Sequence, residues 1–251
     1  MVTSPLRHLI SAEALATIIG EPEVCVVDAR WYIDQPSQGR RDYEVGHLPG
    51  AVYASLDDHL SGQIGAGRHP LPSPNAFAKS LTSLGITQGS HVVIYDQRGG
   101  AIAARLWWML TAQGHRSVAV LDGGIQAWES AGGGLEAGPM SVVRNPTSNR
   151  YPTVAWSGVV SRHDVATRSV ETIVIDARAP ERYRGDEEPV DLVAGHIPGA
   201  VSASLTGNLD ADERFLPSEA LSERFSDLGL SNVSVVSQCG SGVTACHNIL
   251  A

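Results

Sequence analysis

The chain has 251 residues, of which 43% are hydrophobic, and a formal net charge of −9 at pH 7. A chain of this size can bury one large core or two ordinary ones. The acidic balance argues against nucleic acid or an anionic membrane as the main partner, because both reward basic patches. No apolar run approaches the roughly 20 residues of a membrane span. The three cysteines, Cys25, Cys239 and Cys246, lack metal-ligand spacing, and we expect reduced thiols in the cytoplasm.

The first half of the chain alternates short β-branched runs with helix-like segments. It begins with Ser11 followed by AEALATII, a pattern that predicts an N-capped helix. Strands are then predicted within 24–30, 51–56 and 91–96, helices within 73–86 and 100–114, and a further strand and helix within 117–133. This alternation predicts a parallel sheet with helices on both faces, an α/β/α arrangement.

Three segments of the first half recur in the second half in the same order. CVVDAR (25–30) returns as IVIDAR (173–178), GHLPGAVYASL (46–56) as GHIPGAVSASL (195–205), and HVVIYD (91–96) as SVVSQC (234–239). The offsets of 148, 149 and 143 residues are far longer than the period of a solenoid. We therefore expect two tandem α/β/α domains, 1–138 and 152–251, each with its own core, joined by a linker at 139–151.

The second repeat is shorter at its end than the first. After Asp96 the first repeat continues through a helix, a strand and a second helix, whereas only twelve residues follow Cys239. We therefore expect the second domain to lack its last strand and helix. Such a gap exposes the backbone groups of the neighbouring strand.

Cys239 lies in the turn between a predicted strand at 233–238 and a helix. Ligands of parallel α/β sheets bind at the carboxyl ends of the strands, where this turn falls. Gly240 and Gly242 let the backbone curl around the sulfur, and amides at a helix N-terminus stabilise a thiolate. We predict that Cys239 is a nucleophile. The first repeat has Asp96 at this position, so we predict that the first domain is not catalytic.

Other residues of the repeated motifs fit structural roles. Cys25 lies within a predicted strand and Cys246 on the helix that follows the turn, and we expect both to pack in a core. Asp28, Asp176 and Arg178 lie at strand ends, where we expect them to act as structural partners.

The VVDAR, GHLPGA and CGSGVTA segments together resemble tandem-domain rhodanese sulfurtransferases over nearly the whole chain. The resemblance implies an inactive first domain and an active second domain whose cysteine, Cys239, carries a persulfide. It implies sulfur transfer from 3-mercaptopyruvate or thiosulfate to a thiol, a thioredoxin-like protein or cyanide, without a metal or organic cofactor. CGSGVT is similar to the mercaptopyruvate branch, because thiosulfate enzymes tend to have CRKGVT, with cations where this chain has Gly240 and Ser241.

The resemblance also implies a proton relay. GRHPLP (67–72) is similar to a segment whose histidine, here His69, joins a serine of the active loop and an aspartate of the first domain. These would be Ser241 and Asp57, with Asp58 as the alternative carboxylate. A hydroxyl–imidazole–carboxylate relay of this kind moves a proton during C–S cleavage.

Donor binding is the last role that the resemblance implies. Arg182 matches the family arginine that holds the donor carboxylate through its planar fork of donors. Gly240, Gly242, Val243 and Thr244 would complete the binding loop around the donor. Mercaptopyruvate enzymes often have a second arginine where this chain has Val190, and Arg184 is a candidate to replace it.

Two functions of other classes compete with sulfur transfer. Protein phosphatases of similar fold require an arginine six residues after the cysteine, and this chain has Ala245 there. An inactive binding module that keeps the fold without catalysis would suit the short second repeat. Within the family, thiosulfate:cyanide sulfurtransferase activity is the alternative to the mercaptopyruvate activity.

Overall fold

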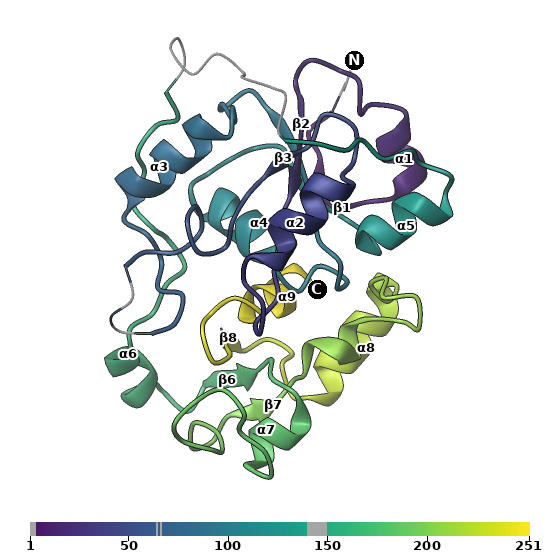
Figure 1. Ribbon diagram of the computed structural model, residues 1–251. Coiled ribbons are helices and arrows are strands. Elements are labelled where there is room, and N and C mark those ends of the chain that lie inside the picture. Colours follow the sequence, from purple (N-terminus) through teal and green to yellow (C-terminus); the bar gives the residue numbers. More distant parts are fainter. Residues whose placement is uncertain (1–3, 64, 66, 140–149) are drawn as a thin grey trace.

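The computed structural model describes residues 4–63, 65, 67–139 and 150–251, so most of the predicted linker lies outside the described residues. The strands form one sheet in each half of the chain (Figure 1). The first has the order β1-β5-β4-β2-β3, with β1 (Arg7–Ile10), β2 (Val24–Asp28), β3 (Val52–Tyr53), β4 (His91–Tyr95) and β5 (Val118–Leu121). The second has the order β7-β6-β8, with β6 (Thr172–Asp176), β7 (Val201–Ser202) and β8 (Ser234–Gln238). Every strand pair among the described residues is parallel, as predicted.

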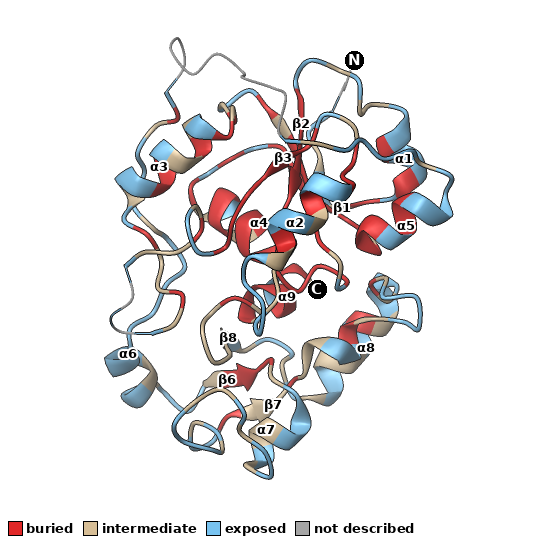
Figure 2. Ribbon diagram, viewed as in Figure 1, coloured by how far each residue is buried: buried red, intermediate tan, exposed pale blue. Residues whose placement is uncertain are grey.

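Helices cover both faces of the first sheet, and its strands β2 to β5 are buried, whereas the edge strand β1 is partly exposed (Figure 2). Successive side chains of β2 point to opposite faces, because a strand repeats every two residues. Cys25 and Val27 pack with α3 (Pro74–Ser83) and α4 (Ala103–Ala112). Val24 and Val26 pack with α1 (Ala12–Ala16), α2 (Gln38–Val45) and α5 (Gly124–Ser130). The predicted α/β/α arrangement is confirmed for this sheet.

The second half adds α6 (Arg162–Ala166), α7 (Pro180–Arg184), the 3-10 helix η1 (Leu205–Asn208), α8 (Ser218–Asp227) and α9 (Ala245–Leu250). Serine side chains cap the first helix of each half. The Ser11 hydroxyl accepts the amide of Ala14, which confirms the predicted cap. Ser161 caps α6 in the same way, with Asp164 completing a capping box.

The repeated DAR motifs make the same contacts in both halves. Arg30 donates to the Asp28 carboxylate, and Arg178 donates to the Asp176 carboxylate. Each arginine also donates at 2.6 Å to the carbonyl of the glycine that opens the repeated GH(L/I)PGA segment. The prediction that these residues are structural partners is confirmed.

The two halves share a hydrophobic core. Helix α9 packs on α4, and Val243, Cys246 and Leu250 belong to the same buried cluster as the apolar side chains of β2 and β4. Among the described residues, the core of the first half therefore continues into α9, whereas Val174 and Ile175 of β6 are buried outside this cluster. The physical reason is that the apolar side of α9 faces α4 of the other half.

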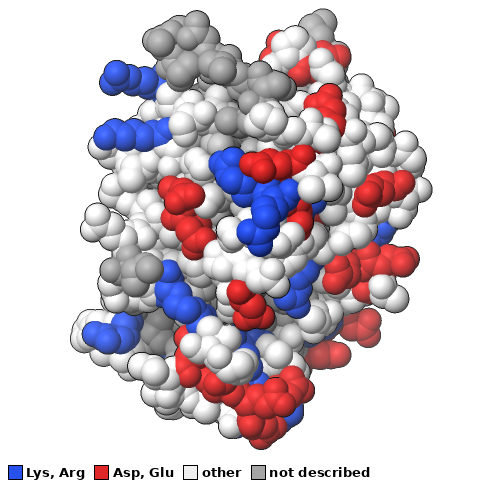
Figure 3. All heavy atoms as spheres, viewed as in Figure 1, with Lys and Arg blue, Asp and Glu red and all other residues white. Residues whose placement is uncertain are grey.

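In the described part of the chain, no helix has the length and apolarity that crossing a bilayer requires. The face shown in Figure 3 mixes charges of both signs, and acidic side chains gather over its lower end, where α7 lies. Binding of an anionic ligand therefore depends on a local arrangement of hydrogen-bond donors rather than on a broad basic surface.

Candidate active site

Cys239 lies in the turn between β8 and α9, as predicted. Its Sγ accepts a hydrogen bond from the backbone amide of Gly242 at 3.1 Å. Gly242 has a φ of 74°, in the left-handed region that favours glycine. Cys239 as a residue is half-buried, and its sulfur is held by this backbone donor.

The matching turn after β4 holds a carboxylate. The side chain of Asp96 is fully buried. Its two oxygens accept hydrogen bonds of 2.7–3.0 Å from the amides of Arg98, Gly100, Ile102 and Ala103. This turn of the repeat therefore directs several amides toward one anionic group.

The remaining two cysteines are core residues. Cys25 is buried in β2. Cys246 is buried in α9, and its Sγ donates to the carbonyl of Gly242 at 3.4 Å. Burial raises the pKa of Cys246 to about 12, so its thiol is not a nucleophile at neutral pH. The packing roles predicted for both residues are confirmed.

The structure brings together two members of the predicted relay. Nε2 of His69 lies 3.4 Å from Oδ1 of Asp57, so Asp57 rather than Asp58 is the neighbouring carboxylate. Trp31 orders this pair, because its indole donates to Oδ2 of Asp57 at 2.9 Å and its ring meets His69 edge-on. Ser241 lines the same cavity as His69.

The ring of His69 is largely buried. Its buried Nδ1 has no hydrogen-bond partner among the described residues, including Ser241. Burial lowers the pKa of His69, Asp57 opposes this effect, and Arg68 and Arg105 add to it. The imidazole is therefore neutral at neutral pH.

Arg182 lies beside the Cys239 turn but already has partners. Its Nε and Nη2 donate to Glu188, and Nη2 also donates to Asp191 at 2.9 Å. Arg184 does not replace the missing second arginine, because it pairs at the surface with Asp186.

Arg105 of α4 is a residue that sequence reasoning missed. Its guanidinium is buried and donates to the carbonyls of Gly242 and His69, both at 3.1 Å. One side chain of the first half therefore joins the cysteine turn to the histidine loop. An arginine on an otherwise apolar helix, ARLWWML, is the signal that sequence reasoning passed over.

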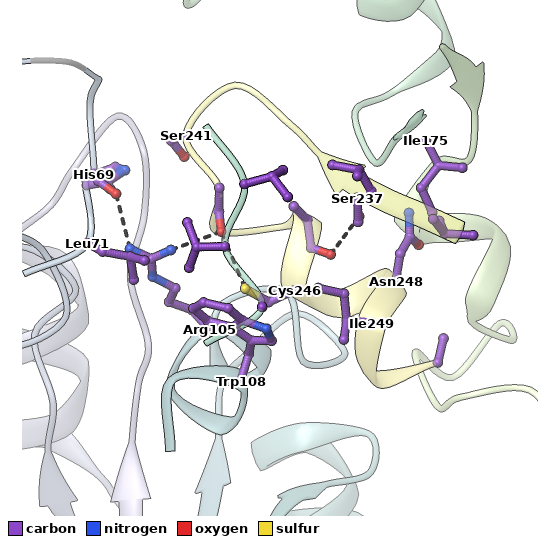
Figure 4. Close-up of a pocket in the computed structure, with 18 of the residues that line it drawn as sticks. His69, Leu71, Arg105, Trp108, Ile175, Ser237, Ser241, Cys246, Asn248 and Ile249 are labelled. Atoms are coloured by element: carbon purple, nitrogen blue, oxygen red, sulfur yellow. Dashed lines mark hydrogen bonds between the residues drawn. The ribbon is translucent and has the colours of Figure 1, made fainter. Parts of the chain in front are cut away.

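A cavity of about 800 Å³ lies beside the turn. Figure 4 shows Arg105 reaching between His69 and the cysteine turn, with Ser241 at one end of the cavity and Ile175 and Asn248 at the other. Among the described residues, the lining includes Ser241 but not Cys239. The cavity therefore lies behind the turn. Arg182, by contrast, approaches the turn itself, at Gly240.

The other residues of the cysteine loop differ in the groups that they can present to a sulfur donor. The side chain of Val243 is buried in the shared core, so this residue can contribute only backbone groups. Thr244 precedes the first residue of α9, and its hydroxyl makes no capping hydrogen bond. Gly240 faces Arg68, Arg182 and Asp191.

Known proteins share this sequence and this fold. Residues 11–131 match the rhodanese-like domain family. A probable 3-mercaptopyruvate sulfurtransferase of Pseudomonas aeruginosa is 43% identical over 97% of this chain and 88% of its own length. SseB of Mycobacterium tuberculosis, named as a thiosulfate sulfurtransferase, is 44% identical over 94% of this chain and 84% of its own length.

Solved structures agree with these relatives. The crystal structure of SseA from Escherichia coli, described as a 3-mercaptopyruvate sulfotransferase with the rhodanese fold, matches with a TM-score of 0.83 and 30% identity. The match covers 97% of this chain and 92% of SseA. The repeated motifs, the paired sheets and these relatives lead to one assignment: the chain belongs to the tandem-domain rhodanese family of sulfurtransferases.

Proposed function

We propose that the chain transfers sulfur from 3-mercaptopyruvate to a thiol, a thioredoxin-like protein or cyanide through a persulfide on Cys239. The observation that carries this proposal is the Gly242 amide at 3.1 Å from the Cys239 Sγ. It lies in a turn whose counterpart binds the Asp96 carboxylate with four amides. Such a turn suits a thiolate, and then a persulfide anion.

In the first step the Cys239 thiolate attacks the thiol sulfur of the donor. An S–S bond forms as the C–S bond breaks, and the electron pair of the C–S bond passes into the enolate of pyruvate. His69 takes the proton of the donor thiol and passes it to Ser241, as the Ser241 hydroxyl gives its own proton to the enolate oxygen and so forms the enol. The neutral state of His69, which follows from its lowered pKa, suits this task.

In the second step the acceptor attacks the outer sulfur of the persulfide. The S–S bond breaks, its electron pair returns to Cys239, and the acceptor leaves as a persulfide or, for cyanide, as thiocyanate. The domain roles follow: residues 152–251 carry the nucleophile, and residues 1–138 support it. We place this chemistry in the cytoplasm, because a thiol nucleophile needs a reducing compartment.

Mass spectrometry after incubation with 3-mercaptopyruvate tests the proposal. One extra sulfur is expected on the Cys239 peptide, and Cys239→Ser should abolish transfer. Cys246→Ser is the matched control and should keep most of the activity, because this thiol is buried and its pKa is about 12. Persulfide on Cys246, or transfer by Cys239→Ser, would contradict the proposal.

The choice of donor needs its own measurement, because the relatives carry the names of both activities. Side-by-side kinetics should give a higher kcat/KM for 3-mercaptopyruvate than for thiosulfate. The reverse order would mean that thiosulfate is the donor, with the Cys239 persulfide retained.

A further inference from the structure

Arg105 of α4 connects two loops that belong to different halves of the chain. Its Nη1 donates to the carbonyl of Gly242, in the Cys239 turn, at 3.1 Å. Its Nη2 donates to the carbonyl of His69 at 3.1 Å and to that of Leu60 at 3.4 Å. One planar guanidinium group therefore joins the turn that holds the cysteine to the loop that holds the histidine (Figure 4).

The contact with Gly242 fixes the amide that faces the Cys239 sulfur. Glycine has wide backbone freedom, and Gly242 adopts a φ of 74°. Its amide donates to Sγ of Cys239 at 3.1 Å. Its carbonyl accepts from Arg105 at 3.1 Å and from Sγ of Cys246 at 3.4 Å. Because the carbonyl is held on one side, the amide stays directed at Cys239 on the other.

The contact with His69 holds the backbone from which the imidazole extends. Nε2 of the ring lies 3.4 Å from Oδ1 of Asp57, and the ring meets Trp31 edge-on. The position of His69 is thus set twice, since Asp57 and Trp31 contact the imidazole and Arg105 binds the main chain. Arg105 therefore relates this main chain to the cysteine turn.

Packing alone would be served better by an apolar side chain at position 105. Arg105 is only 3% exposed and lies in a mostly apolar helix segment, ARLWWML. Its Nε is buried and has no hydrogen-bond partner among the described residues. Burial of a charge that keeps an unpaired donor costs stability. The two carbonyls that Arg105 binds therefore explain an arginine here, whereas packing does not.

We propose that Arg105 is a positioning residue of the sulfur-transfer reaction, which sets the distance between the Cys239 sulfur and the His69 imidazole. This inference rests on the proposed function, in which both groups act on one donor molecule. Charge-assisted hydrogen bonds from one rigid fork keep the two loops at a constant separation. A displacement of about 1 Å between reacting groups can lower a rate about a hundredfold, so the bridge acts on turnover rather than on donor affinity.

Steady-state kinetics with two donors provide the first test. Arg105→Met keeps most of the bulk of the side chain without its donors, and it should lower kcat for 3-mercaptopyruvate about a hundredfold with little change in KM. Its kcat for thiosulfate should fall only about tenfold, because cleavage of that donor uses the cysteine turn but not His69. Arg105→Lys should recover only part of either loss, because an ammonium group keeps the charge but lacks the fork that reaches both carbonyls.

A double-mutant cycle isolates the part of the effect that passes through His69. In a His69→Ala background, Arg105→Met should lower turnover of 3-mercaptopyruvate about tenfold instead of about a hundredfold, because the imidazole that Arg105 positions is already absent. Fully additive losses would overturn the link between the two residues.

Alkylation of Cys239 by iodoacetamide provides a readout that does not depend on sulfur transfer. Arg105→Met should slow modification of the Cys239 peptide about tenfold at pH 7, because the amide that stabilises a thiolate is no longer held in place. His69→Ala should leave this rate unchanged, since the imidazole acts on the donor.

Arg224→Met is the matched control. Arg224 of α8 is half-buried, donates to the carbonyl of Ser204 at 2.9 Å and has a buried Nη1 without a partner among the described residues. Its removal should leave turnover of both donors nearly unchanged. Urea denaturation establishes that each variant is folded under the assay conditions, and if Arg105→Met is not, Arg105→Lys carries the same comparisons.

The outcomes separate this inference from the proposed function. Equal losses with the two donors, or an unchanged kcat in folded Arg105→Met, would overturn the bridging role even if the enzyme transfers sulfur. A wild-type chain that does not turn over 3-mercaptopyruvate would overturn the proposed function. Slower alkylation of Cys239 in Arg105→Met would then still support Arg105 as the residue that positions the turn.

Discussion

The turns after β4 and β8 occupy the same position in the two repeats but hold their anionic groups differently. The Asp96 carboxylate is buried and accepts four amides of its own turn. Cys239 as a residue is half-buried, and its sulfur accepts one amide, that of Gly242. The first turn is closed and complete in itself, whereas the second is open and is completed by side chains of the first half: Arg68, His69 and Arg105. The repeat that has Asp96 thus contributes side chains to the surroundings of Cys239 in the other repeat.

The largest expected effect comes from breaking the closed turn. Asp96→Asn replaces a carboxylate oxygen with an amide group that faces backbone donors, so the free energy of unfolding should fall by about 3 kcal/mol or more. Urea denaturation at pH 7 measures this change. An unchanged midpoint would mean that the four amides do not depend on a negative charge.

The second prediction removes a side chain that the first half contributes to the open turn. His69→Ala should lower turnover of 3-mercaptopyruvate about a hundredfold, because general acid–base help is lost. Thiosulfate turnover should change little, because its cleavage releases sulfite without forming an enol. Ser241→Ala should show the same selectivity if the two residues act in one relay. Equal losses with both donors would argue against a proton-transfer role.

The third prediction concerns His247, which links α9 to the Asp96 turn and to η1. Its Nε2 donates to the carbonyl of Gly99 in the Asp96 turn at 3.0 Å, and its Nδ1 accepts from Asn208 at 3.1 Å. Burial lowers the pKa of His247 to about 4, although the Gly99 carbonyl and Asp96 oppose this shift. The neutral ring is therefore the form that stabilises the fold.

Since the ordinary histidine pKa is 6.5, the stabilisation by His247 is complete above that pH and declines toward pH 4. Between pH 7 and 5 it should contribute about 2 kcal/mol to the loss of unfolding free energy. Urea denaturation of the wild type and of His247→Asn at both pH values measures the contribution of His247 to this loss. The same loss in the variant and the wild type would assign the acid sensitivity to other groups.

The smallest expected effect distinguishes the turns through one left-handed glycine in each. Gly100 and Gly242 have φ angles of 89° and 74°, so alanine at either position should cost about 1–2 kcal/mol of stability. Turnover should fall about tenfold or more only in Gly242→Ala, because the amide of residue 242 faces the reacting sulfur. A similar loss of turnover in Gly100→Ala would show that the first turn also shapes the chemistry.

Sequence reasoning predicted the parts of the molecule that depend on local patterns. The parallel sheets, the twin DAR contacts and the correspondence of Asp96 with Cys239 all follow from short segments that occur twice in the chain. Sequence reasoning left two candidates, Asp57 and Asp58, for the carboxylate partner of His69. It placed both in one segment, but it could not tell which of the two side chains points toward His69.

Contacts between the halves escaped sequence reasoning. The partners Arg68 and Asp191 are 123 residues apart, and Arg105 and Gly242 are 137 residues apart. No periodic pattern in a single sequence indicates a contact between residues that are so far apart in the chain. Val190 stands where a second arginine is common in the family, and the candidate replacement, Arg184, pairs at the surface with Asp186.

The cluster that runs through both halves has a consequence for inheritance as well as for stability. Val243 and Leu250 pack among side chains of the first half, so unfolding of that half uncovers the helix that follows Cys239. The duplicated chain should therefore melt in a single cooperative transition. After such a duplication, recombination can no longer exchange one repeat as an independent module without uncovering apolar side chains of the other.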